Sequence, residues 1–123
     1  MIHQESKKLI DEFMKTTNAE GVLVTDINGQ MLYTTESKLE NSELEELSAL
    51  LSVSDSMYSK INEKLKTDQK ELTVIVNKTD YILIKKVEDA FVLLSQIKRT
   101  EDINMIYNEV EKFISVFLSK GIL

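Results

Sequence analysis

The sequence contains few of the residue combinations that catalyse reactions or bind metals. His3 is the only histidine and cysteine is absent, so a Ser-His-Asp arrangement would require His3, and thiolate chemistry and cysteine-based zinc sites are excluded. His3 has no His, Cys or Asp neighbour at ligand spacing, which favours a surface position on a terminal helix over a metal ligand. We therefore expect no catalytic residues, no metal site and no cofactor.

Two pairs of neighbouring carboxylates have ordinary structural explanations. Glu45-Glu46 falls in what we interpret as the first turn of a helix, where the helix dipole favours negative charge. Glu88-Asp89 separates two apolar segments and is typical of a hairpin turn. We predict no acid–base role for either pair.

Arg99 is the only arginine among 15 basic residues. An arginine inserted into a partner's nucleotide site could stabilise phosphoryl transfer. Its position between the last expected strand and the last expected helix is also that of a solvent-exposed junction residue. We favour the junction.

Composition limits the partners and the compartment. The net charge is −6 and the pI is about 4.8, whereas binding to nucleic acid needs a basic surface. The N-terminus lacks the apolar region of a signal peptide, and no apolar run approaches the roughly 18 residues of a membrane-spanning helix. We expect one domain over residues 1–123, no nucleic-acid partner, no membrane insertion and a cytoplasmic location.

The first third of the chain predicts a helix followed by a β-hairpin. Apolar residues at helical spacing indicate an amphipathic helix over residues 2–17, and Asn18 can adopt the left-handed conformation that ends it. Strand-like segments at residues 21–25 and 31–35 follow. Between them, Asn28-Gly29 is the preferred pair for a type I′ hairpin turn.

A long helix is predicted from Ser42 to about Lys66. Ser42 and Glu45 have the spacing of a capping box. The apolar positions of this helix cover roughly 180°, wider than the stripe of about 100° that packs on one surface, so a second neighbour is needed. One stripe contains Leu44, Leu47, Leu51, Tyr58, Ile61 and Leu65; the other contains Leu50, Val53 and Met57.

Three apolar segments with short polar breaks predict an antiparallel meander over residues 71–77, 81–87 and 90–97. A last helix is expected after Thr100, interpreted as its N-cap with Glu101 and Asp102 in the first turn, and it should end at Gly121. The predicted order is α-β-β-α-β-β-β-α, an α+β fold.

This order and the hairpin Gly21-Val-Leu-Val-Thr-Asp-Ile-Asn-Gly29 resemble the Roadblock family over about residues 3–120. That family includes the dynein Roadblock light chain, Ragulator scaffold subunits and bacterial and archaeal regulators of small GTPases. The resemblance implies a profilin-like, three-layer α/β/α domain with a five-stranded antiparallel sheet in the order 2-1-5-4-3. Helices 1 and 3 would cover one face and helix 2 the other.

The resemblance also implies a dimer, in which the third strand pairs with its copy and the middle helices pack together. An edge strand as apolar as residues 72–76, with no proline and no inward charge, is an aggregation hazard unless it is paired. The second stripe of the middle helix likewise needs a partner. The predicted interface residues are Leu50, Val53, Met57, Leu72, Thr73, Val74, Ile75 and Val76.

The function implied is a non-catalytic dimeric scaffold that binds a small Ras-like GTPase and modulates its GTP hydrolysis or only tethers it. The second chain would be another copy or a paralogous Roadblock-like protein. We place the GTPase contacts on the exposed edge of the middle helix, at Ser48, Ser52, Asp55 and Ser56.

Two other classes of protein remain open as alternatives. A longin-like trafficking adaptor shares the β-β-α-β-β-β core but normally begins with a strand, so residues 2–17 count against it. A PAS- or GAF-type small-molecule sensor needs a concave polar pocket, whereas these strands offer mainly Val, Leu and Ile.

Overall fold

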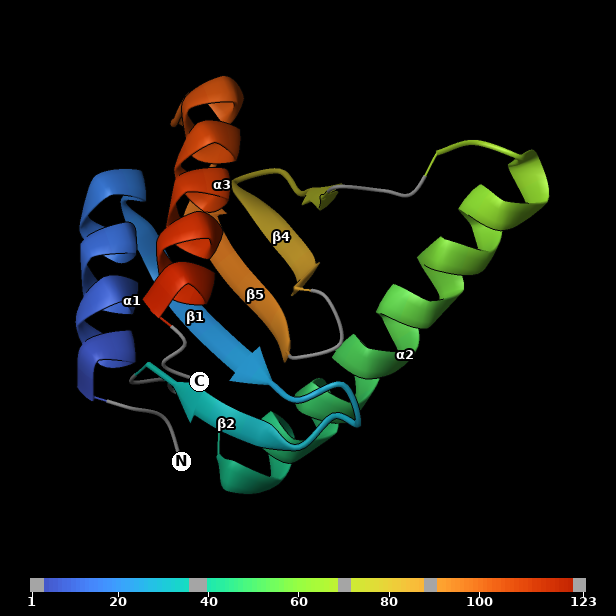
Figure 1. Ribbon diagram of the computed structural model, residues 1–123, viewed down its shortest axis with the longest axis horizontal. Helices are drawn as coiled ribbons and strands as arrows, with labels where there is room; N and C mark the ends of the chain where they lie inside the picture. The colour runs from blue at the N-terminus through green and yellow to red at the C-terminus, as the bar shows by residue number, and fades with distance from the viewer. Residues whose placement is uncertain (1–3, 36–39, 69–71, 88–90, 121–123) are drawn as a thin grey trace.

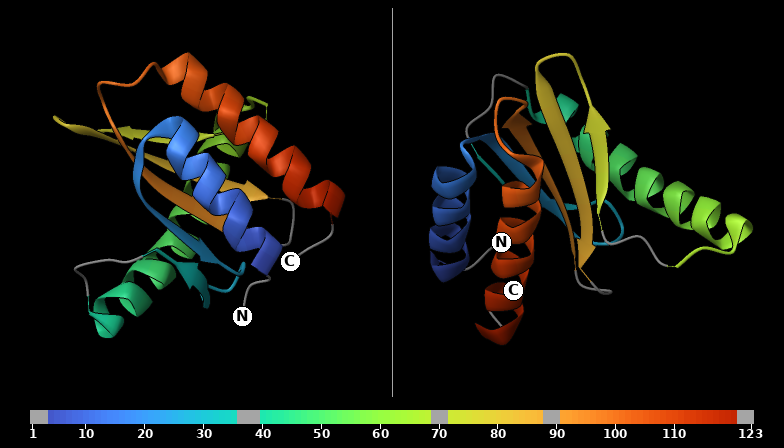
Figure 2. Two further views of the ribbon diagram at one scale, coloured as in Figure 1. Left: turned by 90° about the vertical axis from the view of Figure 1, so that its left-hand side faces the viewer. Right: turned by 90° about the horizontal axis from the view of Figure 1, so that it is seen from above.

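The structure is a computed structural model that describes residues 4–35, 40–68, 72–87 and 91–120, without the side chains of Asp55 and Lys120. Its five strands form one antiparallel sheet in the order β2-β1-β5-β4-β3, as predicted. Figures 1 and 2 show α1 and α3 on one face and α2 on the other, which confirms the predicted three-layer arrangement. The elements are α1 (Gln4–Thr17), β1 (Ala19–Thr25), β2 (Met31–Thr34), α2 (Asn41–Leu65), β3 (Thr73–Val76), β4 (Asp80–Val87), β5 (Phe91–Lys98) and α3 (Ile103–Lys120).

The two faces of the sheet carry cores of very different size. The large core lies between the sheet and the α1/α3 layer, where three pairs of phenylalanine rings lie with centroids 5.0 to 5.4 Å apart. Among the described residues, the small core under α2 has four buried members, Leu23, Leu51, Ile84 and Val92. α2 is therefore held by much less apolar contact than α1 and α3.

The central strand β5 contributes to both cores because its residues alternate between the faces. Phe91, Leu93 and Ile97 lie in the large core, and Val92 lies in the small one. Both neighbours, β1 and β4, pair with β5 along its length.

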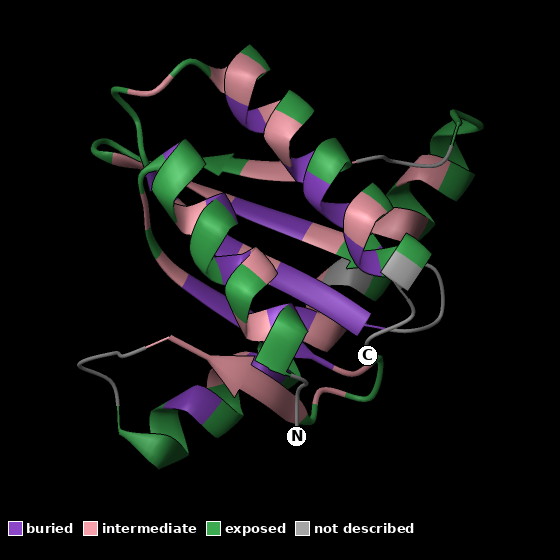
Figure 3. Ribbon diagram, turned by 60° about the vertical axis from the view of Figure 1, so that its left-hand side comes forward, coloured by how far each residue is buried: buried purple, intermediate pink, exposed green. Residues whose placement is uncertain are grey.

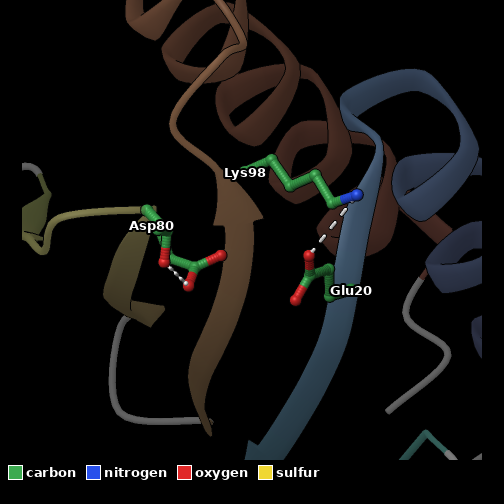
Figure 4. Close-up of polar contacts among 4 residues, drawn as sticks. Glu20, Asp80 and Lys98 are labelled. Atoms are coloured by element: carbon green, nitrogen blue, oxygen red, sulfur yellow. Dashed lines mark hydrogen bonds and ion pairs between the residues drawn. The ribbon is translucent and has the colours of Figure 1, made fainter.

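A bulge interrupts the pairing of β1 with β5 between Ala19 and Gly21. The bulged residue, Glu20, turns its carboxylate towards Lys98 on β5, with an Oε1–Nζ distance of 3.8 Å (Figure 4). Both side chains are well exposed, so this ion pair adds little to stability.

The turn between β1 and β2 differs from the predicted type I′ turn. That turn needs positive φ at both central residues, but only Gly29 has it, at 90°, among the described residues of this loop. The Asp26 carboxylate accepts hydrogen bonds from the backbone N–H groups of Asn28 and Gln30, both at 2.9 Å. This Asx-type bonding stabilises a longer loop, and the pairing shifts by one residue between Val24 and Thr25.

The predicted N-caps of the two later helices were each wrong by two residues. α2 begins after Glu40, whose N–H donates to the Glu43 carboxylate at 3.2 Å; the capping box is therefore Glu40/Glu43, not Ser42/Glu45. α3 is capped by Asp102, which accepts from the N–H of Asn104 at 2.8 Å, rather than by Thr100.

The ends of the first two helices use left-handed residues. Asn18 ends α1 at a φ of 57°, as predicted, and Lys66 ends α2 at the same angle. The expected stop of α3 at Gly121 lies outside the described residues.

Candidate interaction surface

The large exposed apolar side chains of this chain are concentrated on α2. Each member of this set has at least half of its surface exposed, and we call the set the α2 apolar face. It consists of Leu50 (56%), Val53 (56%), Met57 (58%), Ile61 (50%) and Leu65 (68%).

The α2 apolar face arises because α2 is longer than the sheet can cover. A helix of 25 residues is about 37 Å long, and Figure 1 shows its C-terminal part extending beyond the strands. Leu44 and Leu51 are buried, but no described side chain of α2 after Leu51 is. Figure 3 shows exposed and half-buried residues over this far end. Ile61 and Leu65, predicted to lie in the stripe against the sheet, are therefore exposed.

The edge strand β3 lies on the same side of the molecule as the far end of α2 (Figure 2). β3 pairs with β4 through one edge, and in the described part of the chain no strand pairs with its other edge. Ile75 and Val76 are 37% and 57% exposed. Leu72 and Val74 are half-buried against the large core. Thr73 is half-buried as well.

Of the predicted interface residues, those on α2 and at the end of β3 are exposed, whereas Leu72 and Val74 contact the core of their own chain. Ile75 pairs with Ile82, two residues from Ile84 in the small core. Because side chains two apart share a face, Ile75 points to the α2 side of the sheet. An apolar helix face and an unpaired strand edge therefore open to the same region.

Two of the four residues placed at the exposed edge of α2, Ser48 and Ser52, form hydrogen bonds within the chain. Ser48 is fully buried and donates to the Leu44 carbonyl at 2.9 Å, so its predicted exposure was wrong. Ser52 is half-buried and donates to the Ile27 carbonyl at 2.8 Å. Ser56 is exposed as predicted. The Asp55 side chain lies outside the described part of the chain.

Small residues on α2 let the β1–β2 loop approach the helix closely. A Cβ built on Gly29 would lie 3.2 Å from the Ser48 carbonyl oxygen and 3.2 Å from the Ala49 Cα. The hydrogen bond from Ser52 fixes the same loop. In the sequence, the small residues Ser48, Ala49 and Ser52 were a sign that another backbone could approach this side of the helix. From the sequence, we instead assigned Ser48 and Ser52 to a partner site.

A partly open hollow of about 340 Å³ lies beside this contact. It is lined by Ser52, Ser56 and Ser59 of α2 on one side and Lys86 of β4 on another. Ile27 and Val92 also line it, so the hollow combines three hydroxyls and an ammonium group with two apolar side chains.

The other candidate chemical residues have structural roles or are not described. Arg99 is exposed and donates to the Asn77 carbonyl at 3.2 Å, and thus joins the start of the α3 connection to the β3–β4 turn. His3, Glu88 and Asp89 lie outside the described residues. In residues 4–35, 40–68, 72–87 and 91–120, no group of three or more His, Cys, Asp or Glu residues could hold a metal ion.

Tyr33 of β2 is a titratable group with a shifted pKa. Burial raises the pKa of its phenol, and the negative charge of Asp11 on α1 raises it further. Both causes come from packing of β2 near α1, so the shift does not point to a catalytic site. Among the described residues, no helix combines the length and apolar character needed to cross a membrane.

Sequence comparison places the chain in a known family. A family model described as the Roadblock/LC7 domain matches residues 5–96. The chain belongs to the Roadblock/LC7 family. The match covers α1, the sheet and α2, and it favours this family over the longin-like and PAS- or GAF-type alternatives. Among curated protein sequences, no relative matches the chain.

Solved structures of Roadblock/LC7 and profilin-like proteins share the fold. Myxococcus xanthus MglB has a TM-score of 0.81 and 16% identity, over 94% of this chain and 97% of that chain. A Roadblock/LC7 domain from Streptomyces avermitilis has a TM-score of 0.78 and 10% identity, over 94% and 97%. LokiProfilin1, solved in complex with rabbit actin, has a TM-score of 0.57 and 14% identity, over 94% and 96%. At these identities the likeness concerns the fold.

Proposed function

We propose that this chain is a dimeric, non-catalytic platform that binds a small Ras-like GTPase and regulates it. The observation that carries the proposal is the α2 apolar face beside the unpaired edge of β3, in a chain of the Roadblock/LC7 family. The second chain is another copy or a paralogous Roadblock-like protein. We also propose a cytoplasmic location for the complex.

The physical argument for a dimer is that both features are unfavourable in water. A set of five apolar side chains, each at least 50% exposed, forms the kind of patch that marks an interaction site. The unpaired N–H and C=O groups of an edge strand favour pairing with another strand. A second chain that covers α2 and extends the sheet from β3 satisfies both at once.

The dimer would present a composite surface across its two-fold axis. A symmetric pair of α2 helices provides one such surface, so we expect one GTPase per dimer. We propose contacts at Ser52 and Ser56, which line the hollow, and at Asp55, and we leave out Ser48 because it is buried. The platform itself should hydrolyse nothing.

The proposal is tested by titrating the dimer with Ras-like GTPases from the same organism, loaded with GTP or GDP, in an assay that follows both binding and hydrolysis. We expect one GTPase to bind with a preference for one nucleotide state. If no Ras-like GTPase binds in either state, the functional assignment fails.

A variant localises the proposed contact. Ser56→Arg adds a bulky cation at an exposed position of α2 and should weaken GTPase binding at least about tenfold, within the range of an interface substitution. The dimer should remain intact. Ser115→Arg places the same side chain at an exposed position of α3, in the opposite layer, and should bind normally. Equal affinities would remove Ser56 from the contact surface.

A further inference from the structure

On the side of α2 that carries its apolar face, acidic residues lie near one end of the helix and basic residues near the other. At 100° per residue, Glu43 and Glu46 near the N-terminal end lie on the same side of the helix as Val53 and Met57. Lys60 and Lys64 near the C-terminal end lie there too. All four charged residues are exposed. This side of the helix therefore changes from acidic through apolar to basic.

The helix dipole explains only part of this pattern. Acidic residues stabilise the first turn and basic residues the last, and the effect fades within that turn. Glu43 is in the first turn, where it also bonds the Glu40 N–H, and Lys64 is in the last turn. Glu46 and Lys60 lie beyond these turns. Like charges three or four residues apart also repel each other, as Glu43 and Glu46 do at the acidic end and Lys60 and Lys64 do at the basic end.

We propose that these charges select a second copy of this chain as the partner and set the antiparallel register of the two α2 helices. The inference rests on the proposed dimer and specifies its partner and pairing. A two-fold axis across α2 makes the helices antiparallel and places the acidic end of each against the basic end of the other. With the axis near Val53, Leu50 of one copy faces Met57 of the other, and Glu43 faces Lys64.

The same register brings Glu46 to the turn that contains Lys60 and Lys64. Each contact occurs twice because the interface is symmetric. A parallel arrangement would instead place acid against acid and base against base. Complementary charges that flank an apolar interface also determine which helices pair with each other. In an antiparallel pair, an identical copy carries the opposite charge at each of these positions.

The test uses two variants that are each self-repelling but mutually complementary. The acidic variant carries Lys60→Glu and Lys64→Glu. The basic variant carries Glu46→Lys and Glu43→Gln, since glutamine retains the capping hydrogen bond of position 43. At about 50 mM salt, where surface charges are weakly screened, each variant alone should dimerise at least about tenfold more weakly than the wild type. Their mixture should form a heterodimer with affinity within about threefold of the wild type.

Controls with the same charge changes elsewhere separate register from net charge. Glu45→Gln with Glu63→Lys alters exposed positions about 120° around α2 from Met57, and Lys15→Glu with Lys112→Glu alters exposed positions on α1 and α3. Both controls should dimerise like the wild type, and raising the salt to about 500 mM should reduce the defect of the test variants.

The outcomes distinguish this inference from the dimer itself. If the wild type dimerises and both charge variants dimerise equally well at low salt, or if their mixture shows no recovery, the charges do not set the pairing and the inference is overturned. If the wild type is itself a monomer, the proposed dimer fails as well. Recovery in the mixture also shows that both variants are folded.

Discussion

At the scale of single residues, Gly29 joins two layers of the molecule. It holds a φ of 90° and lies against the backbone of α2, where an added Cβ would come within 3.2 Å of both the Ser48 oxygen and the Ala49 Cα. A backbone oxygen and Cα cannot move aside as a flexible side chain can. The position therefore combines a conformational requirement with a steric one.

Gly29→Ala should lower the free energy of unfolding by roughly 1 to 3 kcal/mol because it imposes both costs. Gly21→Ala is the matched control, since its nearest contact is 3.5 Å from a side-chain oxygen and its φ lies outside the positive range. The control should leave stability unchanged or raise it by up to about 1 kcal/mol. Urea denaturation measures both, and equal stabilities would show that the loop does not rest on α2 as described.

Two buried serines provide a second residue-scale contrast. Ser48 donates a hydrogen bond to Leu44, whereas the Ser95 hydroxyl in β5 has no hydrogen-bond partner among the described residues. Ser48→Ala should cost roughly 0.5 to 1.5 kcal/mol, and Ser95→Ala should be neutral or stabilising by up to about 1 kcal/mol. Thermal unfolding of the two variants tests the sign. Destabilisation by Ser95→Ala would mean that its hydroxyl forms a bond that contributes to stability.

At the scale of elements, helical and strand periodicity was enough to predict the order and approximate extent of all eight elements. The predicted helix of residues 42–66 is observed as Asn41–Leu65, because its apolar spacing continues over the whole stretch. Periodicity does not reveal which part of a helix the sheet can reach. Leu65 lies within about 60° of Leu44 and Leu51 around the helix, yet it is 68% exposed because it lies beyond the sheet, so only the tertiary arrangement decides its exposure.

The errors in the predicted caps and turn have a common cause. Several residues near each boundary could have made the local hydrogen bonds: Glu40 and Ser42 before α2, and Thr100 and Asp102 before α3. The docking of each helix on the sheet selects between them. The Asn28-Gly29 pair was similarly overruled, because the Asp26 carboxylate and the contact with α2 stabilise a longer loop.

The packing of α3 supports a test at the element scale. Phe113 is 6% exposed and contacts the rings of Phe13 at 5.2 Å and Phe117 at 5.4 Å. Phe113→Ala should therefore destabilise by roughly 3 to 5 kcal/mol. Leu118→Ala, at a position of the same helix that is 40% exposed, should cost less than about 1 kcal/mol. A loss below about 1 kcal/mol for Phe113→Ala in denaturant unfolding would contradict the packing of α3 against α1 and the sheet.

At the scale of the whole molecule, the unequal cores connect stability with assembly. The α1/α3 layer has a large aromatic core of its own, while α2 is anchored mainly through its N-terminal half. A single chain thus leaves the far part of α2 with little to pack against. In the proposed dimer, the second copy would pack against this exposed part of α2. Dimerisation would therefore stabilise the folded chain, and stability would rise with protein concentration.

The last prediction tests this linkage. We expect a dimer by light scattering at about 100 µM protein, well above the Kd of a specific interface. Met57→Glu combined with Ile75→Lys should give a soluble monomer, because it places charges in the apolar seam and at the strand edge without changing the net charge. Leu118→Lys with Ser115→Glu makes the same exchange at exposed positions of α3 and should remain dimeric.

The wild type should also become more resistant to unfolding as its concentration rises, whereas the Met57/Ile75 variant should not. A wild-type monomer at this concentration, or a Met57/Ile75 variant that still dimerises, would show that these surfaces do not form the interface.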